Sequence, residues 1–143
     1  MAMTSSGLTL SLDPDSLKII SDFQNSNFGP LLESNLTTAM NFAVSTVMDS
    51  MRSNMDAGFM NPTGALEDSM TPNVSPYLST ITMGQPYDWR REEGFSGMTD
   101  SLGRFYPNDP GIHYASKALS QNKTTISDMF SNAIGQTAIG ESL

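Results

Sequence analysis

The residues with the greatest potential for chemistry in this chain are few and far apart. His113 is the only histidine and the chain has no cysteine, so a metal site would depend on one imidazole and on carboxylates from distant positions. The segment Gly94-Phe95-Ser96-Gly97 is close to a nucleophile elbow, but that motif has one further residue between the serine and the second glycine. The sequence therefore predicts that the protein is not an enzyme and that it holds neither a metal nor a cofactor.

The charged run Arg90-Arg91-Glu92-Glu93 is the other candidate for chemistry. Neighbouring residues of a strand point to opposite faces, so the two carboxylates would not converge on one substrate. Residues two apart share a face, which favours an exposed charge ladder or an ion pair between subunits over catalysis. Trp89, the only tryptophan, is either part of the core or an anchor in a contact.

We therefore predict that this run and the segment after it form a contact surface. Residues 95–111 show no clear periodicity, and a loop of this length in a small domain is usually functional or ordered by a partner. We expect this loop to be disordered in the free subunit and to become ordered on assembly. The predicted interface residues are Tyr87, Trp89, Arg90, Arg91, Glu92, Phe95, Arg104 and Phe105.

The first half of the chain predicts the elements that must carry this surface. Leucines alternate with polar residues from Leu8 to Leu12, as in a strand with one buried face, and Asp13 can cap a short helix over Pro14–Phe23. A long helix is predicted over Pro30–Asp56, ending near Gly58. Its apolar residues recur at steps of three and four: Leu32, Leu36, Met40, Ala43, Val47, Met51 and Met55.

After the long helix the apolar period changes to two. The pattern predicts strands over Ala65–Met70, Tyr77–Met83 and Tyr87–Gly94, then the loop, and then a helix over Ile112–Ile134. Residues 135–143 are predicted to be a flexible tail. The predicted fold is α+β, an antiparallel sheet packed against one long helix with a C-terminal helix, in a single domain over residues 1–143.

Composition limits the classes of partner. Fifteen acidic and seven basic residues give a net charge of −8, and the basic residues do not cluster beyond Arg90-Arg91. Tight nucleic-acid binding is therefore not expected, whereas an acidic surface would let DNA pass without being trapped. No stretch approaches the roughly 18 apolar residues of a membrane span, and residues 1–7 lack the features of a secretory signal, so we expect a soluble protein with no membrane partner.

Two motifs, taken in order, resemble those of the tail-completion, or tail-terminator, proteins of long-tailed bacteriophages. In that family a Pro-x-Asp/Thr-Thr-Gly-x-Leu-x-x-Ser segment follows a long helix, and Pro62-Thr63-Gly64-Ala65-Leu66-Glu67-Asp68-Ser69 has that place here. The family's Tyr-Ala-x-x-x-Glu-x-Gly segment corresponds to Tyr87–Phe95. A single Thr63 stands where the family has a pair of residues, and Asp88 stands where a small residue is common.

The resemblance implies a structural virion protein of the tail and neck. It would form a ring, expected to be a homohexamer, at the head-proximal end of the tail, where it would end growth of the tail tube and join tail to head. Its partners would be further copies of itself, the tail tube protein and a head-closure or connector protein. Assembly would take place in the host cytoplasm, and DNA would pass through the lumen without specific binding.

Two alternatives remain. The chain could form another connector ring nearer the portal, as a head-closure or adaptor protein. It could instead be a small cytosolic binding module, which would be a monomer with a ligand pocket.

Overall fold

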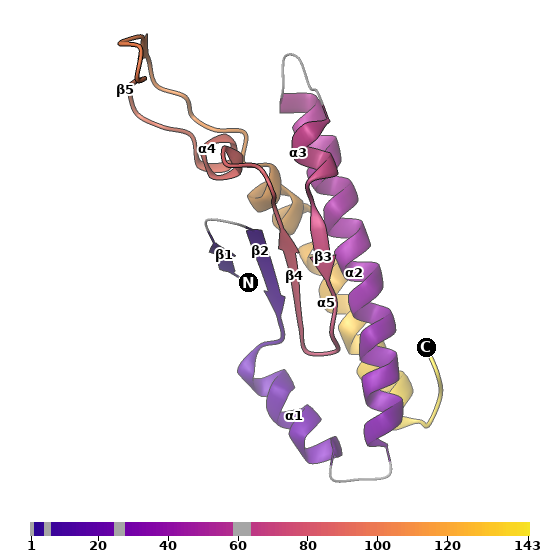
Figure 1. Ribbon diagram of the computed structural model, residues 1–143. Coiled ribbons are helices and arrows are strands. Elements are labelled where there is room, and N and C mark those ends of the chain that lie inside the picture. The colour runs from indigo at the N-terminus through magenta and orange to yellow at the C-terminus, as the bar shows by residue number, and fades with distance from the viewer. Residues whose placement is uncertain (1, 5–6, 25–27, 59–63) are drawn as a thin grey trace.

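The computed structural model describes residues 2–4, 7–24, 28–58 and 64–143, and it is an α+β fold in which a small antiparallel sheet packs against a long helix (Figure 1). The first strand that was expected is β2 (Gly7–Ser11), and the short helix after it is α1 (Pro14–Gln24). Asp13 caps α1 as predicted, because its Oδ1 accepts the N–H of Ser16 at 2.9 Å and its Oδ2 accepts the Ser16 hydroxyl at 3.0 Å.

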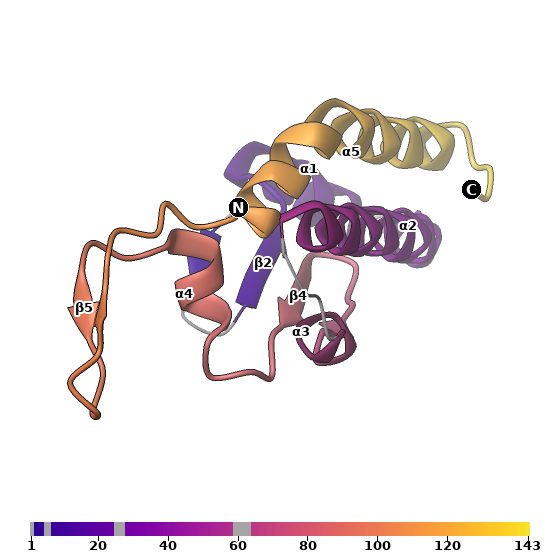
Figure 2. The same cartoon turned by 90° about the horizontal axis from the view of Figure 1, so that it is seen from above.

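Two long antiparallel helices, α2 (Gly29–Gly58) and α5 (Tyr114–Ala138), form the body of the molecule (Figures 1 and 2). At 30 residues, α2 is about 45 Å long. All seven apolar residues of its predicted stripe are buried, which confirms both the helix and the face that it turns inward. The loop from Gln24 to Gly29 and the residues after Gly58 fall partly outside the described residues.

The sheet covers the helix pair with its strands in the order β1-β2-β4-β3, all antiparallel. Its other strands are β1 (Ala2–Thr4), β3 (Thr71–Asn73) and β4 (Leu78–Thr82), the last within the predicted strand Tyr77–Met83. Alternate residues of the two central strands face the helices. Leu8, Leu10 and Ile81 join Met83 in one core cluster with side chains of α2 and α5.

Two predicted strands are helices instead. Residues 65–70 contain α3 (Ala65–Asp68), and residues 87–94 contain α4 (Asp88–Glu93). Ala65, Leu66 and Glu67 in the first segment and Arg90 to Glu93 in the second favour helix, and in the second segment the alternation of Tyr87, Trp89 and Arg91 misled the interpretation. Tyr87 and Trp89, which alternate in the predicted strand, are both exposed at this helix.

The C-terminal segment is held more firmly than predicted. Fraying from Gly135 was expected, but α5 continues to Ala138. Beyond the helix, the side chain of buried Asn35 fixes the chain, since its Nδ2 donates to Glu141 O at 2.9 Å and its Oδ1 accepts the N–H of Leu143 at 2.9 Å. The same Nδ2 donates to the buried Thr137 Oγ1 at 3.0 Å. A single buried amide therefore ties α2, α5 and the tail together.

Candidate subunit interface

The segment predicted to be a loop is a projecting arm, defined here as residues 95–109. Its base is closed by reciprocal backbone hydrogen bonds of 2.8 Å between Phe95 and Asp109. Farther out, β5 (Met98–Thr99) pairs with β6 (Phe105–Tyr106) in a short hairpin. Figures 1 and 2 show the arm directed away from the helical body. Every residue from Ser101 to Asn108 is exposed.

Asp100 organises the tip of the arm. Its Oδ1 accepts the N–H groups of Leu102 and Arg104, each at 2.9 Å, and its Oδ2 accepts Arg104 Nε–H at 2.7 Å and the Tyr106 hydroxyl at 3.2 Å. The backbone N–H of Arg104, with further hydrogen bonds from its side chain, from Leu102 and from Tyr106, holds the pKa of Asp100 below its ordinary value. The tip therefore has a defined shape supported by one ionised carboxylate.

Apolar side chains crowd the outer part of this surface. Leu102 is 76% exposed and Phe105 is 70% exposed, and Tyr106 also lies open to solvent. Trp89, which the sequence left between core and contact, is 52% exposed on α4 beside the base of the arm. Water-exposed large apolar side chains grouped in one region are typical of contact surfaces.

The arm is rooted where α4 meets the start of α5. Here the backbone at Gly94 lies against the backbone at Gly111, and each glycine has a φ angle of 76°. A Cβ on Gly111 would lie 2.5 Å from the carbonyl oxygen of Glu92. The N–H of Ile112 donates to Arg91 O at 2.7 Å, and the N–H of His113 donates to Glu92 O at 3.1 Å. Only glycine permits both the left-handed backbone and this close approach.

Glu92 is the centre of this root. It was predicted to lie in an exposed charge ladder, which is wrong, because the side chain is fully buried. Its carboxylate accepts the N–H groups of Ala115 and Ser116, each at 2.9 Å, together with the Ser116 hydroxyl. These are the free amide donors at the N-terminus of α5, where a negative charge is also favoured by the helix dipole. Glu92 therefore fixes the arm to the body and is not available to a partner.

Tyr114 adds a second link between α4 and α5. Its ring is fully buried and its hydroxyl donates to Asp88 O at 3.2 Å. Burial, with smaller contributions from the carboxylates of Glu92 and Asp88, raises the pKa of Tyr114 far above its ordinary value, so the phenol stays protonated as a donor. His113, at the start of α5 as expected, has its Nε2 2.8 Å from Pro110 O.

The structure brings most of the predicted interface residues to one end of the molecule. Tyr87, Trp89, Arg90 and Arg91 are exposed on and before α4, and Arg104 and Phe105 are exposed on the arm. Phe95 is half-buried at the base, where the Arg90 guanidinium lies 5.6 Å from the centre of its ring. Leu102 and Tyr106 are also exposed on the arm, but they were not among the interface residues predicted from the sequence. The Asp100-Ser-Leu-Gly103 turn signal between two short alternating runs could have indicated the hairpin.

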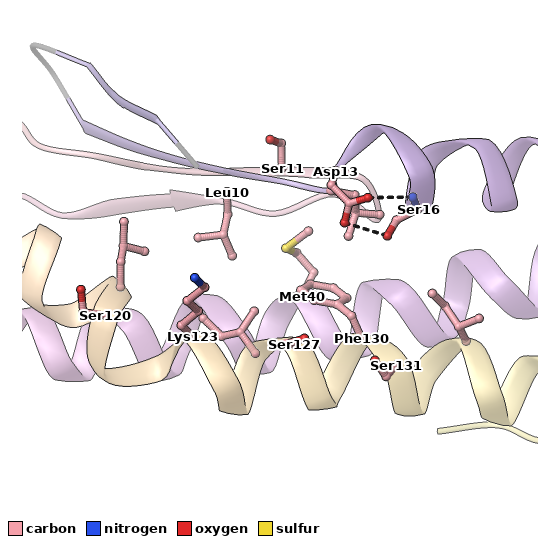
Figure 3. A pocket seen from close by; sticks show the side chains of 14 residues that line it. Leu10, Ser11, Asp13, Ser16, Met40, Ser120, Lys123, Ser127, Phe130 and Ser131 are labelled. Carbon is pink, nitrogen blue, oxygen red and sulfur yellow. Dashed lines mark hydrogen bonds between the residues drawn. The ribbon is translucent and has the colours of Figure 1, made fainter.

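A second feature is a cavity of about 450 Å³ between the end of β2, the start of α1 and the middle of α5 (Figure 3). Its inner wall is apolar, formed in part by Leu10, Met40 and Phe130. Its rim is polar. Ser120, Lys123, Ser127 and Ser131 follow one side of α5, and Ser11, Asp13 and Ser16 lie opposite them.

Within the described residues, no group of three or more histidine, cysteine, aspartate or glutamate side chains is arranged to hold a metal ion. Among the helices that the structure describes, none combines the length and the apolar content needed to cross a bilayer. Comparison of the chain with protein-family models, with curated proteins and with solved structures gives no match. The first motif of the family resemblance, Pro62–Ser69, is only partly covered by the structure. Residues Gly64–Ser69 are described and contain α3, whereas Pro62 and Thr63 lie outside the described residues.

Proposed function

We propose that this protein is a structural assembly subunit that forms a closed ring at the head-proximal end of a phage tail, where it ends tube growth and joins tail to head. The arm is the observation that carries this proposal. It presents Leu102 and Phe105 to solvent on a hairpin whose root is fixed by buried hydrogen bonds, as expected of an element built to reach another molecule.

The free energies involved argue against a dimer held by a single arm contact. Burying Leu102 and Phe105 fully would contribute about 1.5–3 kcal/mol each. Association costs roughly 4–15 kcal/mol in lost freedom of motion, so one arm contact does not hold two subunits together in dilute solution. A closed ring of six subunits has six such contacts for five association steps, so closure adds one contact without a further loss of free motion.

The placement in a tail rests on the sequence motifs and on charge. The resemblance of the sequence segments Pro62–Ser69 and Tyr87–Phe95 to tail-completion proteins supports it, and a net charge of −8 is compatible with a lumen that DNA crosses without binding. The proposed partners are six copies of the chain, a tail tube protein and a head-closure or connector protein, all within the virion.

The test is electron microscopy combined with mass determination, on the purified protein alone and mixed with tail tubes. We expect rings with the mass of six 15.5 kDa subunits that sit on one end of each tube and stop its elongation. Rings that bind a portal or adaptor complex and ignore tubes would instead support a connector position nearer the head.

The cavity favours a second candidate, a small binding module. Its volume of about 450 Å³ lies within the range of ligand sites, and its apolar wall with a polar rim is typical of them. This candidate predicts a monomer at all concentrations and a ligand that raises its melting temperature. A stable monomer that leaves tail tubes unchanged would favour it over the ring.

A further inference from the structure

The tip of the arm and the wall of the cavity both carry apolar side chains. The tip carries two exposed apolar side chains, Leu102 and Phe105, whereas the cavity has an apolar wall that includes Leu10 and Phe130. The cavity has a volume of about 450 Å³. That space is large enough for two apolar side chains, which would replace water against an apolar wall.

The two features lie on different parts of the same chain. In Figure 1 the arm leaves the body beyond α4 and points outward, whereas the cavity is bordered by the start of α1 and the middle of α5. The root formed by Gly94, Gly111 and Glu92 fixes the direction of the arm. An arm held in this direction points away from the cavity of its own subunit, so Leu102 and Phe105 can enter only the cavity of another molecule.

Charged side chains on the rim of the cavity and on the arm tip also favour an arm tip as the occupant of the cavity. The rim carries Asp13 and Lys123 at separate points along the cavity (Figure 3). The arm tip also carries one basic and one acidic residue, Arg104 and Asp100, in an ion pair of 2.7 Å, and the Arg104 side chain remains 64% exposed. Hydrogen bonds from Ser16 hold the pKa of Asp13 below its ordinary value, so Asp13 is anionic at neutral pH. Arg104 has further guanidinium donors beyond Nε with which to meet a second carboxylate.

We propose that the arm tip of one subunit inserts Leu102 and Phe105 into the cavity of a second copy of this chain, with Arg104 facing Asp13 of that copy. This inference rests on the proposed ring and names its subunit contact. Because the arm and the cavity are different surfaces, the contact can repeat head-to-tail, and it closes a ring when the rotation from one subunit to the next divides a full turn.

Engineered cysteines test this contact directly, because the natural chain has no cysteine. Ser101→Cys lies at the tip and leaves Leu102 and Phe105 in place, and Ser127→Cys lies on the rim of the cavity. The double variant, oxidised or treated with a short bis-maleimide, should give a covalent ladder that ends at the mass of the ring. Ser101→Cys combined with Ser45→Cys, an exposed serine of α2, should give no ladder.

A matched pair of phenylalanine variants gives an independent test. Phe105→Ser should raise the concentration needed for ring formation at least tenfold. Phe42→Ser removes an equally large side chain that is 61% exposed on α2, and it should assemble like the natural protein. Equal assembly of the two variants would overturn the proposed contact.

The polar part of the contact is tested with Asp13→Asn, because asparagine keeps the cap of α1 and removes only the charge. We expect severalfold weaker assembly and a smaller dependence on salt. Arg104→Gln should weaken assembly as well, and the double variant should be no weaker than either single variant, because the two residues act as one pair. Full additivity of the two changes would contradict the pairing.

The outcomes separate this inference from the proposed function. Rings that cap tail tubes without the Ser101–Ser127 cross-link would overturn the arm–cavity contact and leave the ring function standing. Absence of rings, together with a monomer that carries a small molecule in its native mass spectrum, would overturn both.

Discussion

In the helical body, α2 and α5 bury a continuous stripe of side chains, whereas in the arm every residue from Ser101 to Asn108 is exposed. The body is held by contacts between residues far apart in the sequence, such as Asn35 with Thr137 and Glu141. The arm tip is held by bonds within a few residues, centred on Asp100. Changes in the body should therefore alter global stability, and changes at the tip should alter assembly with little effect on folding.

The root between the two regions should show the largest effect on folding. Glu92→Ala would leave the buried amide of Ala115 and the partly buried amide of Ser116 without their acceptor, and we expect it to lower the free energy of unfolding by about 3 kcal/mol. Urea denaturation measures the change, and faster hydrogen exchange at Ile112 and His113 would place it at the root. The control is Glu93→Ala at the exposed neighbouring position, which should be nearly neutral.

The next largest effect on folding is expected for the buried side-chain amide of Asn35 in the helical body. Asn35→Ala would remove the donor to Thr137 and Glu141 and the acceptor for Leu143, at a cost of about 2 kcal/mol in the free energy of unfolding. Amide exchange at residues 139–143 should also increase. Asn41→Ala on the exposed side of the same helix is the matched control. Unchanged exchange in the tail would show that Asn35 does not hold it.

Lowering the pH should unfold the arm tip before it affects the helical body. The pKa of Asp100 is lower in the folded arm than in the unfolded chain, chiefly because the Arg104 N–H bonds its carboxylate. Its stabilising effect is therefore present above the unfolded pKa and is lost as the pH falls through the lower folded value. NMR of the Leu102 and Arg104 amides should report loss of the hairpin in that range. Asp100→Ala should show the same loss at neutral pH, with the unfolding midpoint of the body unchanged.

The smallest effect on folding is expected for the tip itself. Phe105→Ser should change the free energy of unfolding of the subunit by no more than about 0.5 kcal/mol, because the ring is already 70% exposed. Measured below the assembly concentration, it should match Phe42→Ser. A loss well above that limit would mean that Phe105 serves the fold of its own subunit.

The free arm is also open to a direct measurement of order. The sequence predicts that residues 95–111 are disordered in the free subunit, whereas the structure contains a hairpin closed by Phe95 and Asp109. Hydrogen exchange on free and assembled protein would distinguish these states. Equal protection in both would contradict the predicted ordering on assembly.

The sequence by itself determined the helical body. The period of three to four residues from Leu32 to Met55 fixed both the long helix and its buried face, because only a helix places those side chains on one side. The alternation around Leu8 and Ile81 fixed the central strands for the corresponding reason. Asp13 and Pro14 marked the start of α1, since capping depends on neighbouring residues alone.

Only the tertiary structure decided the roles of the charged run and of the arm. Glu92 looks in sequence like its exposed neighbours, and it is buried because the free amides of α5 lie 23 residues further on and need an acceptor. Alternation around Trp89 predicted a strand, but docking against α5 favours a short helix that ends at Gly94. Local pattern cannot carry this information, because burial depends on which distant segment covers a residue.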